Sequence, residues 1–306
     1  KLMAKLTDAI KLGLISVEVA NEIISDVMLG KITAQAAEIK LMGISDDQQN
    51  QGNQGHNTPS PCTTVPKRDR ARCEESFKNK PNGKESVYVE NFDPNNIPKV
   101  AKYNFTELDK FSRMSKIRSA VGHDFSATTP EYDPTHSNCK SMKHYFMPVG
   151  VPRQMSLYSS TPHTFEWMSI KFFSPVDGVI SDVLYSQTSY GTEAGFYIGS
   201  SEFPGYFFRF FHLSLDSNLT NGSVVKAGQQ IATLGGEDTW GEIAVEVRLA
   251  HELNHFISFL QVASDDVLQE YKARGINSPA DAIVTKAQRD ANPLACDDSP
   301  AGWFIG

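Results

Sequence analysis

Apolar residues recur at intervals of four near the start of the chain, as at Leu6, Ile10 and Leu14. This spacing places them on one face of a helix. Gly30 and Gly43 are suited to end helices, because glycine readily adopts the left-handed conformation of a C-cap. We therefore predict a small helical module over residues 1–44 that serves packing or docking, and through which the chain could form an oligomer.

The chain then becomes polar. Residues 45–61 are rich in Gln, Asn, Gly and Pro and have almost nothing to bury, so they are predicted to form a flexible linker. Residues 62–110 remain polar and irregular, apart from a short strand predicted at 86–90. We expect this segment to wrap around the main domain.

Short strand-like runs separated by tight turns begin at about residue 111. The run "SIKFFSPVDGVISDVLYS" is interrupted by a Pro-Val-Asp-Gly turn. In "GEIAVEVRLA" the apolar residues Ile243, Val245 and Val247 alternate with other residues, which is typical of a strand. These patterns predict a mainly β domain of the sandwich or barrel type over residues 111–262, followed by a helical tail over residues 263–306.

Composition and charge narrow the range of partners. The chain has 306 residues, of which 40% are hydrophobic, so it can bury the core of one large or two modest domains. Its net charge of −7 argues against nucleic acid as a main partner, because phosphate binding needs a basic face. No run of about 18 apolar residues occurs, so no membrane span is expected. The first residue is Lys1 rather than Met, which is compatible with removal of a signal peptide.

The chain has four cysteines, Cys62, Cys73, Cys139 and Cys296, and no CxxC pair. A thiolate zinc site is therefore not expected. An even number of cysteines suits two disulfides in an oxidising compartment. We predict the pairs Cys62–Cys73 and Cys139–Cys296, the second of which would tie the tail to the core. Free buried thiols are the alternative.

Three sequons also favour export from the cell. They are Asn104-Phe-Thr, Asn218-Leu-Thr and Asn221-Gly-Ser, each of which matches the acceptor pattern for N-glycosylation. Together with the cysteines they predict an extracellular or cell-surface protein.

The stretch "HELNH", residues 251–255, matches the HExxH zinc motif. That motif needs a helix, because one helical turn brings its two histidines to the same metal ion while the glutamate acts as general base. Here it follows a predicted strand that ends at residue 250, and the residues after it, "FISFLQV", favour extended chain. We therefore expect a loop that carries two histidines and no zinc site of this kind.

Five segments occur in a recognisable order: "AVGHDF" at 120–125, then "FFSPVDGVISDV", "FFRFFHLSL", "NGSVVKAGQQIATLGG" and "IAVEVRL". In this order they resemble the signatures of the lysostaphin-type (LytM-like) zinc endopeptidases, which cut peptide cross-links in cell walls. The resemblance covers about 130 residues. It implies a β domain of the duplicated-hybrid, barrel-sandwich type in a secreted or surface-attached protein.

The resemblance also assigns the chemistry to particular positions. In that family the histidine and aspartate of HxGxD and the second histidine of HxH hold the zinc ion. These positions are Ala120, Asp124 and Ala244 in this chain. Glu242 stands at the first histidine of HxH, and His212 stands at the catalytic histidine of the "HLs" strand. Two of the three metal ligands are therefore alanines, which predicts a catalytically inactive relative.

Other residues could rebuild a metal site. Asp124, His212 and Glu242 could join His144, which lies in a long insert, while His123 on a strand should face away from Asp124. These five residues are our candidates for the binding cleft. Alternatively, Asp124 and His212 hydrogen-bond to each other in a cleft that binds something else.

Three functions follow from these patterns. The first is a binding or structural domain without a cofactor, with a cell-surface peptide, glycan or protein as its ligand. The second is an active zinc hydrolase with rearranged ligands. The third is a carrier domain of the lipoyl kind, for which Lys226 in the "VVKAGQ" turn is the candidate attachment site.

Overall fold

The chain divides into two units, Lys1–Pro59 and Ser60–Gly306. The computed structural model describes part of the second unit, namely residues 88–127, 129–133, 137–150, 165–188, 191–235, 240–250, 253–296 and 303–305. The predicted helical module, the linker and the pair Cys62–Cys73 lie outside the described residues.

The described residues form strands for the most part, with a few short helices. In chain order the elements are η2 (Leu108–Lys110), β1 (Phe111–Ser115), β2 (His144–Pro148), α5 (Phe165–Met168), β3 (Lys171–Phe173), β4 (Gly178–Thr188), β5 (Gly191–Ser200), β6 (Tyr206–Leu215), β7 (Val224–Val225), β8 (Gln230–Leu234), β9 (Gly241–Val247), β10 (His255–Ile257), α6 (Phe259–Val262), α7 (Asp265–Lys272), η3 (Pro279–Ala282), α8 (Lys286–Ala291) and β11 (Trp303–Ile305). The predicted mainly β class is confirmed.

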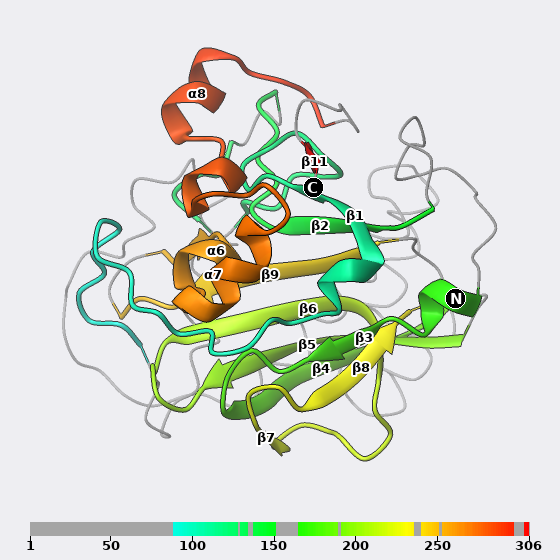
Figure 1. Cartoon of the computed structure of the whole chain (residues 1–306). Coiled ribbons are helices and arrows are strands. Elements are labelled where there is room, and N and C mark those ends of the chain that lie inside the picture. The colour runs from blue at the N-terminus through cyan, green and yellow to red at the C-terminus, as the bar shows by residue number, and fades with distance from the viewer. Residues whose placement is uncertain are drawn as a thin grey trace, which may run out of the picture. The chain divides into compact units, whose positions relative to one another are not determined.

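The strands of this region pair in a single antiparallel sheet (Figure 1). Its order is β11-β1-β2-β9-β6-β5-β4-β7, and three further pairings join β10 to β9, β3 to β8 and β8 to β6. In Figure 1 the strands rise from β7 at the bottom to β1 near the top. The Pro-Val-Asp-Gly turn separates β3 from β4, as the sequence predicts. Strand β9 lies inside the sheet, between β2 and β6, and all of its residues are buried.

Residues 88–110 follow the sheet with little regular structure of their own. Val89 forms an isolated bridge with Leu249, and Ala101 forms another with Ala263. Of the short strand predicted at 86–90, the described residues 88–90 form a single bridge at Val89. These contacts fasten the segment to the chain just after β9 and after α6.

The main core is rich in phenylalanine. Phe105 lies near its centre and packs edge to face against Phe146 and Phe259, with ring centroids 4.9 Å apart in each case. Phe196 and Phe210 stack at 5.3 Å. Such arrangements match the negative face of one ring to the positive edge of another, or offset the two faces.

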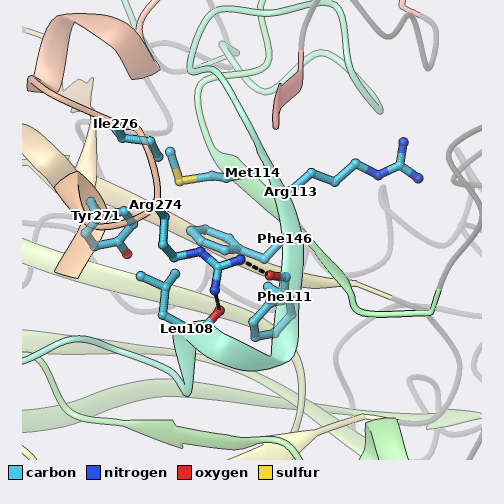
Figure 2. Close-up of a pocket in the computed structure, with 8 residues that line it drawn as sticks. All are labelled: Leu108, Phe111, Arg113, Met114, Phe146, Tyr271, Arg274 and Ile276. Atoms are coloured by element: carbon cyan, nitrogen blue, oxygen red, sulfur yellow. Dashed lines mark hydrogen bonds between the residues drawn. The ribbon is translucent and has the colours of Figure 1, made fainter. Parts of the chain in front are cut away.

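Helix α7 is anchored to β1 through its C-terminal end. Arg274 donates hydrogen bonds to the main-chain oxygens of Leu108, at 2.7 Å, and Phe111 (Figure 2). Tyr271 and Ile276 complete this contact. The space left among these side chains is about 20 Å³, which holds about one water molecule. It is a packing seam rather than a ligand site.

The tail predicted to be helical over residues 263–306 is helical only in part. Helices α7 and α8 lie within it, but β11 near its end pairs with β1, with Met114 opposite Phe304. The sequence Trp-Phe-Ile of β11 consists of residue types that favour a strand. This segment therefore pairs with the edge of the sheet, where the sequence predicts a helix.

A disulfide joins the insert before β2 to this tail. Cys139 and Cys296 are bonded with their Cα atoms 5.0 Å apart, and they are 157 residues apart in sequence. The amide of Cys139 also donates to the carbonyl of Leu294 at 2.7 Å. The predicted pairing of Cys139 with Cys296 is confirmed.

Candidate functional site

The candidate site lies on one face of β2, β9 and β6. In the antiparallel register Glu242 of β9 is opposite Tyr145 of β2 and Phe211 of β6, and Ala244 is opposite Arg209. Paired residues share a face of the sheet, and alternate residues along a strand share it too. This polar face therefore presents Glu242 and Ala244, the two positions that the sequence resemblance assigns to the HxH histidines.

The chain around residues 120–125 covers this polar face. Phe125 packs edge to face on Phe211 at 5.4 Å, and the amide of His123 donates to the Tyr145 hydroxyl at 3.3 Å. Gly122 has a φ of +74°, and a Cβ atom built there would meet the Tyr145 hydroxyl at 2.3 Å. Glycine is required at this position both for its conformation and for the close approach.

Glu242 is buried and charged. Its carboxylate forms an ion pair with the Lys143 ammonium, and the side chains are 3% and 1% exposed respectively. The other carboxylate oxygen accepts a hydrogen bond from Trp240 Nε1 at 2.8 Å. Burial raises the pKa of Glu242, but the positive charge of Lys143, together with His212 and these hydrogen bonds, outweighs burial and lowers that pKa below its ordinary value.

His123 is the second partner of Lys143. Its Nε2 lies 3.1 Å from Lys143 Nζ, and its Nδ1 lies 2.9 Å from the main-chain oxygen of Asp124. A carbonyl oxygen only accepts, so Nδ1 donates to it and Nε2 accepts from the ammonium. Burial of the ring and the charge of Lys143 both lower the pKa of His123. The ring therefore approaches Glu242 through Lys143, on the face where His123 is one of the five candidate cleft residues.

The other retained residues have separate partners. Asp124 Oδ1 accepts from Ser126 Oγ at 2.6 Å, and His212 Nδ1 lies 3.2 Å from Glu193 Oε2. His212 has a φ of +54°, which is rare for a residue other than glycine. Among the residues that the structure describes, no three His, Cys, Asp or Glu side chains converge as a metal site would require. The residues described at this face therefore do not supply the ligands of a zinc ion.

His144 does not belong to this site, contrary to prediction. It is opposite Ile243 in the register and so lies on the other face of the sheet. It is fully buried, with Nδ1 2.8 Å from the carbonyl oxygen of Ser115 and Nε2 2.9 Å from Ser258 Oγ. Burial lowers its pKa to about 4, so it is a neutral, structural histidine.

Sequence reasoning missed Lys143 altogether. It belongs to "SMKHYFMPVG", where a charged residue stands just before a run of apolar and aromatic side chains. Lysine is almost never fully buried unless it is paired. A lysine just before a buried strand was thus a signal that a buried ion pair exists. The sequence could not identify its partner, because Glu242 lies 99 residues further on.

The HELNH motif is not the helical zinc site. His251 and Glu252 lie outside the described residues, but His255 begins strand β10. Extended chain is confirmed for His255–Ile257 and is wrong for Phe259–Val262, which forms α6. The reason is the capping box of Ser258 and Gln261, whose reciprocal hydrogen bonds start a helical turn.

The predicted modification sites differ in exposure. Asn218 and Asn221 are exposed. Asn104 is 4% exposed, its amide nitrogen donates to Glu270 at 2.8 Å, and its oxygen accepts from the Tyr271 hydroxyl at 3.1 Å. A glycan on this nitrogen has no room in the folded domain, which corrects that expectation for Asn104.

Lys226, the candidate for a carrier attachment, is exposed in the turn between β7 and β8, with Nζ 3.8 Å from Asp177 Oδ1. None of the helices in the described part of the chain has the length and apolar character needed to span a bilayer.

A separate cavity of about 410 Å³ lies around β10. Arg118, with a φ of +62°, is in its wall and donates to Glu131 at 2.8 Å and to the carbonyl of Val284 at 2.7 Å. The lining residues are mostly apolar: Phe92, Pro94, Ile97, Ile117, Arg118, Thr129, Pro130, Glu131, His255, Phe256, Ile257, Gln261, Ile283 and Lys286. A cavity of this size is in the range of small-molecule and side-chain binding sites.

Comparisons with known proteins gave matches among solved structures alone. No family model matches the sequence. No curated protein matches it either. Lysostaphin is 15% identical, over 54% of this chain and 49% of its own, with a TM-score of 0.26. Csd3 of Helicobacter pylori is 15% identical over 58% and 41%, with a TM-score of 0.31.

A zinc-containing peptidase from Vibrio cholerae is 19% identical, over 49% of this chain and 40% of its own, with a TM-score of 0.26. The match thus spans less than half the length of each of these three proteins. All three likenesses are at low identity and with partial coverage, and two of the three proteins are named as lysostaphin and a zinc-containing peptidase.

Proposed function

We propose that the β domain over residues 111–262 is a non-hydrolytic relative of the lysostaphin-type endopeptidases that serves as a binding or structural domain at the cell surface. The observation that carries this proposal is the buried Glu242 carboxylate, which is committed to Lys143 and Trp240. A carboxylate that is paired in this way is not available to a metal ion or to a water molecule.

The rest of the polar face supports the same conclusion. A hydrolytic zinc ion needs three protein ligands and one open position for water. Ala120 and Ala244 offer no ligand atom, Asp124 accepts from Ser126, and His212 lies beside Glu193. These positions therefore provide neither a metal site nor a nucleophile paired with a base, one of which hydrolysis would require.

The cavity around β10 supports a binding role. Its walls include Ile117, Phe256 and Ile283, and the Arg118–Glu131 pair lies among them. Such a lining suits the apolar side chain of a peptide or protein better than a sugar, because a sugar needs many hydrogen-bonding partners. The Cys139–Cys296 disulfide agrees with an oxidising, extracellular setting.

The test combines metal content, hydrolysis and binding. Purified, untagged protein is analysed for zinc by elemental mass spectrometry, then incubated with purified peptidoglycan, with and without a chelator. We expect close to zero zinc per chain, no released peptides and retention of the protein on the peptidoglycan. About one zinc per chain together with chelator-sensitive release of peptides would refute the proposal in favour of an active hydrolase.

A pair of variants locates the binding. Ile283→Arg introduces a charge into the wall of the cavity, and Val224→Arg introduces the same charge at an exposed residue of β7. We expect the first variant to lose retention and the second to keep it. Equal retention of the two variants would show that the cavity is not the binding site.

A further inference from the structure

We infer that the Lys143 ammonium is a built-in cation that organises the polar face in place of a bound metal ion. This inference deepens the proposed function and rests on its non-hydrolytic part. It concerns how the buried Glu242 carboxylate and the His123 imidazole are held together by one cation.

The sheet register places Lys143 at the centre of this face. Tyr145 of β2 is opposite Glu242 of β9. Lys143 precedes Tyr145 by two residues and therefore points to the same side of the sheet. Its Nζ atom is bonded to Glu242 Oε2 and lies 3.1 Å from His123 Nε2. One side chain thus links the covering segment at His123 to the inside of the sheet at Glu242.

Aromatic rings enclose the same ammonium. Lys143 Nζ lies 4.5 Å from the centroid of the Phe211 ring, 4.8 Å from that of Tyr145 and 5.1 Å from that of Phe125. The negative face of an aromatic ring attracts a cation at distances up to about 6 Å. Three rings, a carboxylate and an imidazole nitrogen therefore surround one positive charge.

The two charges of the central pair match one another. Lys143 supplies one positive charge and Glu242 one negative charge, while Trp240 donates to the remaining carboxylate oxygen. A buried ion pair of this kind is strongly destabilised when one partner is removed, because the other charge is left without compensation. A divalent cation entering the face would meet the ammonium and be repelled.

The burial of Lys143 argues against a second role for this residue, that of a reactive amine. Its side chain is 1% exposed, and its ammonium is bonded to Glu242. A lysine that forms an imine or acts as a nucleophile needs a neutral amine that its substrate can reach. The Glu242 carboxylate and the surrounding rings therefore close the nitrogen off from a substrate.

The test is a double-mutant cycle on the folded chain, made of Lys143→Met, Glu242→Gln and the double variant, each measured by urea unfolding. We expect each single variant to reduce the ratio of folded to unfolded protein by about 100-fold or more. The double variant should recover at least about 10-fold of this loss, because it leaves no unpaired charge.

A matched control is available on the surface. Lys102 and Glu202 form an ion pair with side chains that are 47% and 54% exposed. The same cycle with Lys102→Met and Glu202→Gln should give a coupling of about five-fold or less. Equal coupling in the two pairs would overturn the inference.

Two further outcomes are decisive. If neither single variant folds, a folded double variant supports the pairing, and a double variant that also fails to fold overturns it. Zinc added to the wild-type protein should leave its unfolding curve unchanged, and stabilisation by zinc would refute the built-in cation. Hydrolysis of peptidoglycan refutes the proposed function separately, whereas a failed cycle without zinc or hydrolysis refutes this inference alone.

Discussion

Strands β6 and β9 have two faces of different character. On one face lie Phe208 and Phe210 of β6 with Ile243 and Val245 of β9, all 0% exposed. The opposite, polar face carries Arg209 and Phe211 of β6 with Glu242 and Ala244 of β9. Burial does not distinguish the two faces along β9, where Glu242 is 2% exposed, whereas the polar-face residues of β6 are only partly buried. The difference lies in how specific the packing has to be.

The apolar face is stabilised by burial, and the polar face by pairing. An apolar core tolerates other apolar side chains of similar volume. On the polar face the cations lie against rings and carboxylates: Lys143 lies against Glu242, Arg209 lies 4.7 Å from the Phe211 ring centroid, and Arg248 lies 3.7 Å from that of Phe207. A polar face of this kind is specified residue by residue.

The largest effect is expected from the apolar face. Phe210→Ala removes a fully buried ring that stacks on Phe196 and should lower the free energy of unfolding by about 4 kcal/mol. Phe207→Ala, its neighbour on the polar face, is only partly buried and should cost clearly less. Urea unfolding of the two variants measures the difference. Equal losses would show that the two faces do not differ as described.

The apolar face is also the part that the sequence predicts well. The alternation of Ile243, Val245 and Val247 in "GEIAVEVRLA" predicts the strand, which β9 confirms, and these three residues lie in the main core. The other side of β9 is buried as well. Hydrophobic period two is a local signal that needs no knowledge of the neighbouring strand.

The polar face depends on the strand register, which the local pattern does not contain. The sequence singled out His144 for this site, but the pairing of β2 with β9 places His144 opposite Ile243 and turns its neighbours Lys143 and Tyr145 toward Glu242. A shift of one residue exchanges the two faces of a strand. The resemblance located Asp124, His212 and Glu242, but it carried no information on Lys143 because that residue corresponds to no family motif.

The second prediction concerns His144, a titratable group on the apolar face. Burial lowers its pKa from 6.5 to about 4. Below pH 6.5 the unfolded chain takes up a proton that the folded chain does not. The free energy of unfolding should therefore fall as the pH is lowered from about 6.5 to about 4, by about 3 kcal/mol from this group. Urea unfolding across this range measures the slope.

Two variants assign that slope to His144. His144→Gln should be less stable near pH 7, because it loses the hydrogen bonds to Ser115 and Ser258, but it should lack this part of the pH dependence. His212→Gln is the control on the polar face, where the imidazole is 43% exposed, and it should leave the slope nearly unchanged. If His144→Gln retains the wild-type slope, the acid sensitivity comes from other groups.

The smallest effect is expected at the edge of the polar face. The Arg248 guanidinium lies 3.7 Å from the Phe207 ring centroid and 5.0 Å from that of Tyr197, and the side chain is 26% exposed. Its ion pairs with Glu246 and Asp182 are long, at 3.6 and 3.9 Å. The contact with the ring is therefore the main interaction, and a cation over an aromatic face at a partly exposed site contributes about 1 kcal/mol.

Arg248→Met, which keeps the apolar stem and removes the charge, should lower the free energy of unfolding by about that amount. Arg248→Lys keeps the charge but loses the planar stacking, so we expect it to fall between the wild type and Arg248→Met. If Arg248→Met were as stable as the wild type, burial of the stem on Phe207 would account for the contact. In that case only the Lys143–Glu242 pair and the three rings around it would specify the polar face. The contact between a cation and a ring at Arg248, on the edge of this face, would not contribute.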